Sequence, residues 1–171
     1  MNFNNFTIKA QEAVQEAVNF VSQNGQQVIE PVHLMAGVLK VGENVTNFIF
    51  QKLGLNARLM NNMVMSEAAS KPKVSGGEPY LSRETNEVLQ KAVSLSKEMG
   101  DEYVSLEPIM LALLLVESSV AKMMKEMGFT EKELRKAIQE LPFLQKKSPI
   151  FHALLKAENR ISGNAKFLLF Q

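Results

Sequence analysis

The residue best suited to chemistry in this sequence is His33, in the stretch IEPVHLMAGVL at positions 29–39. An imidazole serves as a metal ligand or as a general acid and base. One hypothesis is therefore a hydrolase or metal enzyme that uses His33 and nearby carboxylates. The other histidine is His152, and no HxxxH motif or carboxylate–histidine spacing joins the two. The second interpretation, which we favour, places His33 in the first turn of a helix, where it bonds to the neighbouring loop.

Other residue types that carry catalysis do not form a recognisable motif. The sequence has no GxxxxGK[ST] stretch for nucleotide phosphates and no GxSxG nucleophile turn. The pair Gly76-Gly77 lies in a polar stretch, where flexibility explains it better than phosphate binding. Glu84, Glu87 and Glu98 suit a solvated helix face better than a buried acid–base pair. We therefore expect a protein that is not an enzyme and holds no cofactor or metal.

Length and composition suit one compact soluble domain. The chain has 171 residues, of which 46% are hydrophobic and 22% charged, with a net charge of +1. No basic block is interleaved with aromatic residues, so nucleic acid is not an expected partner. No apolar run approaches the ~20 residues that cross a bilayer, and no signal peptide is visible. The absence of cysteine fits a reducing compartment, so we expect a cytoplasmic protein that does not bind a membrane.

The chain contains an internal repeat with an offset of 75 residues. Three pairs of segments align, the last after one deletion: FTIKAQEAVQEAVNFVSQNG (6–25) with LSRETNEVLQKAVSLSKEMG (81–100), IEPVHLMAGVL (29–39) with VSLEPIMLALL (104–114), and LGLNARLMNNMV (53–64) with MGFTEKELRKAI (127–138). The second repeat has Pro108 at the position of His33. A chemistry that both repeats share therefore does not involve this histidine.

This alignment predicts the organisation of the domain. We expect repeat 1 at about 6–65, a linker at 66–80, and repeat 2 at about 81–141. The linker SEAASKPKVSGGEPY is small, polar and contains glycine and proline, which is typical of a connecting segment. No stretch shows sustained period-two alternation, so we expect no sheet. The predicted fold is all-α, with two pseudo-symmetric four-helix repeats packed into one domain.

Capping residues predict where the helices begin. Hydroxyl and amide side chains accept first-turn N–H groups, and proline is tolerated in a first turn because it lacks an N–H that would have no helical partner. Gly25 and Gly100 are expected to end the first helix of each repeat, because glycine adopts the left-handed conformation without strain. The expected starts are Thr7, Pro31, Asn44 and Asn56 in repeat 1, and Ser82, Leu106, Ser119 and Thr130 in repeat 2.

Ten methionines are a further unusual feature of the composition. Methionine-rich surfaces bind varied partners, but at helical spacing most of these side chains are expected to fill the core. Two groups stand out: Met60, Met63 and Met65, and Met123, Met124 and Met127. Where the first and second helices of the two repeats meet, apolar residues can remain partly exposed. That seam favours a groove for unfolded or amphipathic segments.

On these stretches the sequence resembles the Clp N-terminal domain, the double four-helix repeat of Clp/Hsp-type unfoldases. The resemblance covers about residues 1–141 and rests on FTIKAQEAV, IEPVHLMAGVL, GDEYVSLEPIMLALL and the LGLN and MGFT turns. The element IEPVHL is most similar to the ClpB-type disaggregase branch. The protease-feeding branch usually carries an acid where this chain has Val32. That acid belongs to the branch's phosphoarginine-reading site, and only its partner is matched here, by Glu107.

The resemblance implies a role and a set of binding residues. The role is a non-catalytic domain of a stress-response chaperone, which captures apolar segments of unfolded or aggregated proteins and hands them to an ATP-driven AAA+ ring. The implied binding residues match Thr7, Asp101, Glu107, Leu89 and position 108, which is Pro108 here. Each also has a structural interpretation, as a helix cap, a turn residue, a helix-dipole partner or a core residue.

Residues 142–171 form an atypical C-terminal extension, which does not resemble the family's linker into the ATPase modules. Residues 1–141 hold 14 Lys/Arg and 17 Asp/Glu, a balance of −3, whereas 142–171 hold 5 and 1, a balance of +4. We expect a short helix from Ser148-Pro149 and an apolar end, AKFLLF, that packs on the domain. A chain without ATPase modules is expected to be a piece or a truncated form of a longer chaperone.

Three hypotheses about function remain open at this point. The leading one is a domain that binds unfolded or aggregated polypeptide for a ClpB-like chaperone. The second keeps the fold but makes it the docking site for a folded adaptor protein. The third is the enzyme based on His33, which requires that this side chain be exposed beside a second ligand.

Overall fold

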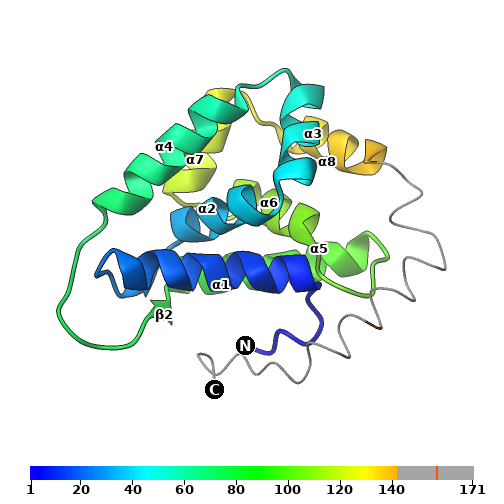
Figure 1. The fold of residues 1–171 in the computed structure, drawn as a ribbon. Helices are drawn as coiled ribbons and strands as arrows, with labels where there is room; N and C mark the ends of the chain where they lie inside the picture. Colours follow the sequence, from blue (N-terminus) through cyan, green and yellow to red (C-terminus); the bar gives the residue numbers. More distant parts are fainter. Residues whose placement is uncertain (142–156, 158–171) are drawn as a thin grey trace.

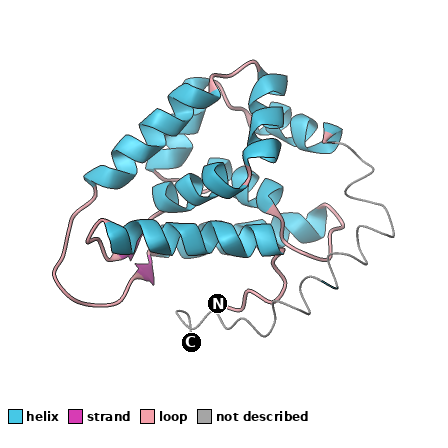
Figure 2. Ribbon diagram, viewed as in Figure 1, coloured by secondary structure: helices cyan, strands magenta, loops and turns pink. Residues whose placement is uncertain are grey.

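The computed structural model describes residues 1–141 and residue 157, so the helix and the packing expected within 142–171 lie outside the described residues. The elements in chain order are α1 (Ile8–Gln23), β1 (Val28–Ile29), α2 (Pro31–Val41), α3 (Glu43–Leu53), α4 (Ala57–Ser70), β2 (Tyr80–Leu81), α5 (Arg83–Glu98), α6 (Leu106–Leu115), α7 (Ser119–Met127) and α8 (Glu131–Glu140). Figures 1 and 2 show that helices make up nearly all of the regular structure. The all-α prediction is confirmed.

The helices begin close to where capping chemistry predicts. Thr7 and Ser82 accept the N–H groups of Ala10 and Thr85 at 3.2 and 3.1 Å. Thr130 caps α8 in the same way, and its hydroxyl also donates to the Glu133 carboxylate. Each such bond satisfies a backbone donor that has no partner within the helix. Gly25 and Gly100 have φ angles of 66° and 77°, as expected of glycines that end a helix.

Two details of the sequence prediction are corrected. Helix α4 continues to Ser70, so residues 66–70 are helical and the connection to β2 is shorter than the predicted linker. The expectation of no sheet is wrong, because β1 and β2 pair in parallel, with Val28 opposite Tyr80 and Ile29 opposite Leu81. Strands of two residues are too short to produce an alternating pattern in the sequence.

Helices α2 and α6 form the centre of the domain (Figure 1). Helix α2 packs against α1 and α4, helix α6 packs against α5, α7 and α8, and the two central helices also contact each other. Helix α6 is buried along nearly its whole length. Helix α3 of repeat 1 packs on α8 of repeat 2, and α4 packs on α7, so the repeats share one core.

The α1–α2 crossing is especially close at Gly37. A Cβ atom on Gly37 would stand 2.1 Å from the Ala13 carbonyl oxygen, which is backbone of the facing helix. The two helices therefore approach each other only because residue 37 has no side chain. Within the described residues, no helix is long and apolar enough to cross a membrane.

Candidate functional site

Two backbone seams join the repeats, and the 75-residue offset relates one to the other. In the α5–α2 seam, Leu81 pairs in parallel with Ile29, next to the first turns of α5 and α2. In the α1–α6 seam, Phe6 pairs in parallel with Val104, next to the first turns of α1 and α6. Phe6 corresponds to Leu81, and Val104 corresponds to Ile29. Each seam therefore ties the start of one repeat's first helix to the start of the other repeat's second helix.

Backbone hydrogen bonds hold the α1–α6 seam together. The Thr7 N–H donates to the Val104 carbonyl at 2.9 Å, and the Val104 N–H donates to the Asn5 carbonyl at 2.7 Å. These bonds place the first turn of α1 beside the first turn of α6. Thr7, the residue before α1, and Glu107, in the first turn of α6, consequently lie in the same seam although 100 positions separate them.

The loop from α5 to α6 completes this seam and carries Asp101. The Asp101 N–H donates to the Ser96 carbonyl at 2.9 Å, and the Ser96 hydroxyl donates to the Tyr103 carbonyl at 2.9 Å. Asp101 is half-buried, whereas Thr7 and Glu107 are each 7% exposed. The structure thus brings three of the sequence-predicted residues to one seam, and Asp101 exposes the most surface among them.

The other two sequence-predicted residues lie inside the domain. Leu89, in the middle of α5, is 0% exposed and belongs to the main core. Pro108, in the first turn of α6, is also buried. The stripe of α5 that includes Leu89 is buried because α5 packs against α6. A bound polypeptide would touch Leu89 only if these two helices moved apart.

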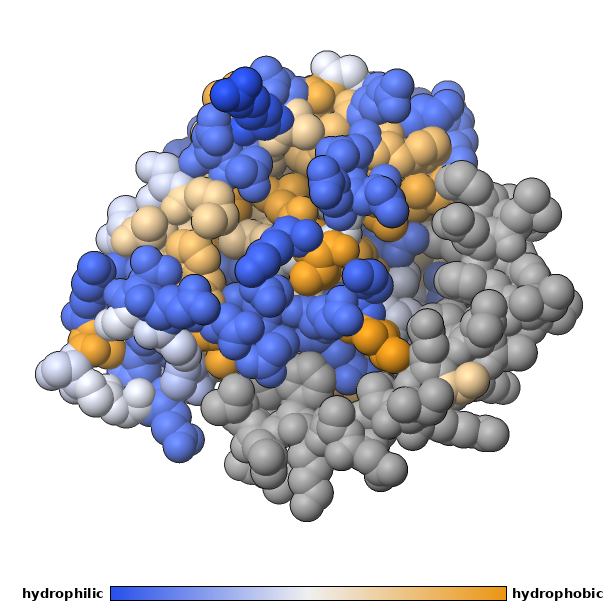
Figure 3. Space-filling view, in the orientation of Figure 1, coloured by the Kyte–Doolittle hydropathy of each residue, from blue (hydrophilic) through white to orange (hydrophobic). Residues whose placement is uncertain are grey.

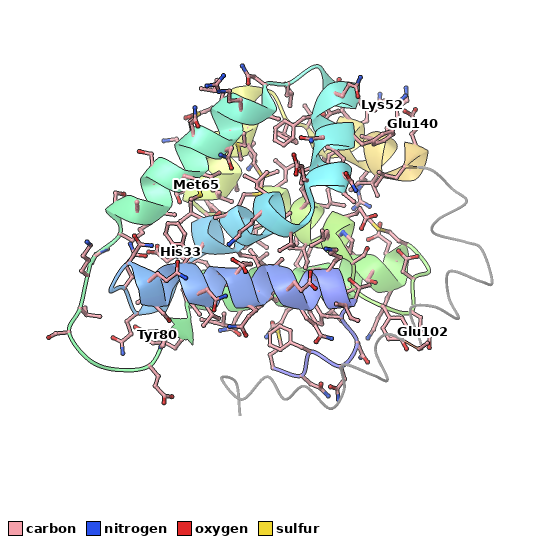
Figure 4. All side chains as sticks on the ribbon, viewed as in Figure 1. His33, Lys52, Met65, Tyr80, Glu102 and Glu140 are labelled. Atoms are coloured by element: carbon pink, nitrogen blue, oxygen red, sulfur yellow. The ribbon has the colours of Figure 1, made fainter. Side chains whose placement is uncertain are left out.

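The loop from α5 to α6 and the first turn of α6 carry three carboxylates, those of Asp101, Glu102 and Glu107. The sequence has no lysine or arginine from residue 98 to residue 121, and five carboxylates fall in this range: Glu98, Asp101, Glu102, Glu107 and Glu117. Glu102 is exposed on the loop that precedes α6 (Figure 4), and Glu98 accepts a 3.0 Å hydrogen bond from Arg135. The loop between α5 and α6 therefore presents an acidic surface, which would favour a cationic ligand.

The α5–α2 seam has a different interior. The Thr85 hydroxyl donates to the Ile29 carbonyl at 2.7 Å, and Thr85 is fully buried. The position equivalent to Thr85 in the α1–α6 seam is Ala10, which has no hydroxyl to donate to the Val104 carbonyl. The two seams share their backbone pairing but differ in the side chains that fill them.

His33 lies in the α5–α2 seam and is 0% exposed. Its Nδ1 accepts the Glu30 N–H at 2.9 Å, and its Nε2 lies 3.0 Å from Gln26 Oε1. Burial lowers the pKa of His33, and the nearby Glu30 carboxylate opposes that shift in part. The predicted bonding of His33 to its neighbouring loop is confirmed. The enzyme hypothesis is wrong in its central requirement, because this histidine is not exposed.

Metal ligands are likewise not gathered at one place in residues 1–141 and 157. No group of three or more His, Cys, Asp or Glu side chains in that part of the chain could hold a metal ion.

Three of the six highlighted methionines are buried in the core, and Met63 and Met127 are partly buried against it. Met60 and Met124 are 0% exposed and Met123 is 7% exposed, whereas Met65 on α4 is 39% exposed. On the face shown in Figure 3, apolar surface is visible between the polar outer sides of α4 and α1. Met65 lies on this side of α4 (Figure 4), but the methionines do not form the α1–α6 seam.

Comparison with known proteins agrees with this architecture. The family model of the Clp repeat (R) N-terminal domain matches residues 5–127. The chain therefore belongs to the Clp repeat N-terminal domain family. The fold and the two seams thus define this protein as a double-repeat N-terminal domain. The resemblance inferred from the sequence is confirmed.

Particular relatives place the chain nearer to one branch of the family. It is 69% identical to the chaperone protein ClpB of Bacteroides thetaiotaomicron over 141 residues, which are 82% of this chain and 16% of that protein. It is 49% identical to ClpB of Porphyromonas gingivalis, with the same coverage of both chains. The chain thus spans about one sixth of the length of these relatives.

Solved structures share the fold. The N-terminal domain of Hsp104 from Candida albicans matches with a TM-score of 0.72 and 22% identity, covering 83% of this chain and 94% of that one. A complex of the ClpV N-domain with a VipB peptide matches with a TM-score of 0.66 and 18% identity, covering 80% of this chain and 86% of that one. At these identities the likeness extends to the fold alone.

Proposed function

We propose that this domain captures extended segments of unfolded or aggregated polypeptides at its α1–α6 seam, as a non-catalytic part of a ClpB-like chaperone in the cytoplasm. The AAA+ modules of such a chaperone would then receive the captured chain. The observation that carries the proposal is the cross-repeat pairing of Phe6 with Val104, because it gathers Thr7, Asp101 and Glu107 at one seam.

Each seam residue has a defined part in this proposal. Asp101 and Glu107 supply negative charge beside a ligand that carries lysine or arginine next to its apolar residues. Thr7 sets the position of the first turn of α1 through its cap and its bond to Val104. Leu89 and Pro108 support the seam from within the core, and they contact the ligand only if α5 and α6 separate.

The capture of extended chains is supported by a structural neighbour of the same fold. The ClpV N-domain has been solved in complex with a peptide, so a double-repeat domain of this shape can hold a short polypeptide. Because the sequence identity is 18%, only the kind of ligand, a short polypeptide, is carried over from the ClpV N-domain to this chain.

The second candidate function is docking of a folded adaptor protein. It is favoured by the low exposure of Thr7 and Glu107, since a preformed rigid surface suits a folded partner at least as well as an unfolded one. The two functions differ in ligand range. Capture predicts weak binding to many unfolded chains, and docking predicts tight binding to one folded protein.

The test is fluorescence anisotropy of a labelled, permanently unfolded polypeptide that carries lysine and arginine next to its apolar residues, titrated with the full chain. The variant is Asp101→Asn combined with Glu107→Gln, which removes two negative charges from the seam with little change in shape. Ion pairs contribute about 0.2–1 kcal/mol each, so the loss of two should raise the variant's Kd about two- to thirtyfold.

Glu84→Gln is the matched control, because Glu84 occupies in α5 the same first-turn position that Glu107 occupies in α6. This control should bind like the wild type, and circular dichroism should confirm that all three proteins stay folded. Equal binding by the wild type and the seam variant would refute the α1–α6 seam as the site. No binding of the unfolded probe by any of them would favour adaptor docking.

A further inference from the structure

A buried polar cluster in the α5–α2 seam is not used by the proposed function. It consists of His33 and Gln26, which occupy the positions equivalent to Pro108 and Asp101 in the α1–α6 seam. Gln26 is 5% exposed and His33 is 0% exposed. Buried polar groups are retained only when they are hydrogen-bonded, so the bonds of this pair determine what it can do.

The bonds define the protonation state of His33. The Glu30 backbone N–H donates to Nδ1, so Nδ1 carries no proton. Nε2 must then carry the proton of the neutral ring and donate it to Gln26 Oε1, 3.0 Å away. Uptake of a second proton would convert Nδ1 from an acceptor into a donor that faces another donor.

Gln26 connects this histidine to the chain that follows α4. Its side-chain Nε2 donates to the carbonyls of Ala68 at 2.8 Å and Lys71 at 3.2 Å. Residue 26 also forms an isolated antiparallel bridge with Lys73, and the Val74 N–H donates to the Gly25 carbonyl at 3.0 Å. The segment 71–74 is therefore held on the seam through residues 25 and 26.

Charged groups around the cluster come from two elements. Glu30 precedes α2, and Lys71 and Glu67 lie at the end of α4. Lys71 Nζ lies 3.1 Å from the Glu30 carboxylate and 3.5 Å from that of Glu67. On the α1 side, His33 meets the Phe20 ring at a centroid distance of 5.7 Å. Desolvation lowers the pKa of His33 and Lys71 adds to this, whereas Glu30, a hydrogen bond with the Ala68 backbone, and Glu67 oppose it.

We propose that His33 and Gln26 form a pH-sensitive latch, in which neutral His33 holds segment 71–74 on the α5–α2 seam and protonation of Nδ1 releases it. A charged ring has to turn away from the Glu30 N–H, and Nε2 then leaves Gln26 Oε1. Gln26 loses the bond that orients its amide toward the carbonyls of Ala68 and Lys71. The segment after α4 opens while the helical core stays folded. Figure 4 shows His33 at the α1–α2 end where the chain leaves α4.

The experiment is amide hydrogen exchange of the full chain by NMR between pH 7.5 and 5.5, with rates corrected for the intrinsic effect of pH. Val74 is the reporter because its N–H bonds to Gly25, and Phe129 is the reference because its N–H bonds to the Met124 carbonyl in repeat 2. When the segment opens, His33 takes up one proton, with the ordinary pKa of 6.5 in the open state. This uptake lowers the protection of Val74 by at most about tenfold between pH 7.5 and 5.5. We expect a decrease of several-fold at Val74 and none at Phe129.

Two variants assign the effect to His33. His33→Gln cannot be protonated, so the pH dependence at Val74 should disappear. His152→Gln removes the only other imidazole of the chain and should leave it unchanged. If His33→Gln fails to fold, the imidazole titration of His33 in the unchanged chain must coincide with the loss of protection at Val74. The latch would be overturned by constant protection at Val74 or by an equal decrease at Phe129. It would also be overturned by a pH dependence at Val74 that survives His33→Gln or is lost in His152→Gln.

Discussion

Replacing Gly37 with alanine is expected to destabilise the protein, although the same change stabilises most helices. In an open helix, alanine is favoured over glycine by about 1 kcal/mol. At residue 37 the new Cβ would stand 2.1 Å from the Ala13 carbonyl oxygen and 3.0 Å from its carbonyl carbon. Both atoms are backbone of α1, so no side chain can rotate away, and α1 and α2 must move apart.

The size of the effect follows from that displacement. Restoring an ordinary contact requires a shift of about 1 Å between two packed helices, and such overpacking costs typically about 1–3 kcal/mol. We place this rigid contact at the upper end, so that about 2 kcal/mol of destabilisation remains after the gain in helix propensity. For a domain of this size, that corresponds to a decrease in Tm of about 4–8 °C.

The assay is urea unfolding followed by circular dichroism, because the chain has no tryptophan. The matched variant is Ala112→Gly, which removes a methyl group at the equivalent position of α6. Ala112 is 0% exposed, so its loss should also destabilise, by about 1 kcal/mol or more. If Gly37→Ala raised the free energy of unfolding, helix propensity would outweigh the contact and the reasoning would be refuted.

Three further predictions concern the core and the α5–α2 seam. Thr85→Val should lower the free energy of unfolding by about 1 kcal/mol, measured by urea unfolding, because the Ile29 carbonyl loses one of its donors; an unchanged midpoint would contradict a role for this bond. Phe50→Ala should cost about 3–5 kcal/mol in thermal or urea unfolding, because the ring is 1% exposed and meets Phe129 edge-on at 5.4 Å; a loss below about 1 kcal/mol would mean that the repeats do not depend on this contact. The folded state lowers the pKa of His33, so the folded protein binds a proton at this imidazole less tightly than the unfolded chain does. The free energy of unfolding should therefore be highest above about pH 6.5. It should decrease as the pH falls through the folded-state pKa, by at most about 1.4 kcal/mol per pH unit. Urea unfolding at pH 7.5 and 5.5 checks this, and an identical slope in His33→Gln would assign the loss to other groups.

Local chemistry made the helices predictable from the sequence. Thr7, Ser82 and Thr130 cap helices because a side-chain oxygen three residues before an N–H reaches it regardless of what else the chain does. Gly25 and Gly100 end helices for an equally local reason. The 75-residue repeat then required the second half to fold like the first, which was sufficient for the all-α class and for the family.

The candidate site was predictable only in part. The sequence correctly placed Thr7 and Glu107 at helix starts, but it did not indicate that these two starts lie side by side. That depends on the pairing of Phe6 with Val104, a contact between residues 98 positions apart that leaves no periodic signal. The sequence contained one signal of the seams, the 75-residue offset of the repeat. The same offset relates the residues of one seam to those of the other.

Burial separated residues that the sequence treated alike. Leu89 lies on an apolar stripe that could equally face a groove or the core, and the packing of α5 on α6 buries it completely. His33 and Pro108 occupy equivalent positions, but only His33 has a glutamine within hydrogen-bonding distance. The sequence alone determined the helices, the repeat and the family, because capping, periodicity and duplication act along the chain. The tertiary structure decided which seam contains the latch and which gathers the acidic residues, because that depends on contacts between repeats.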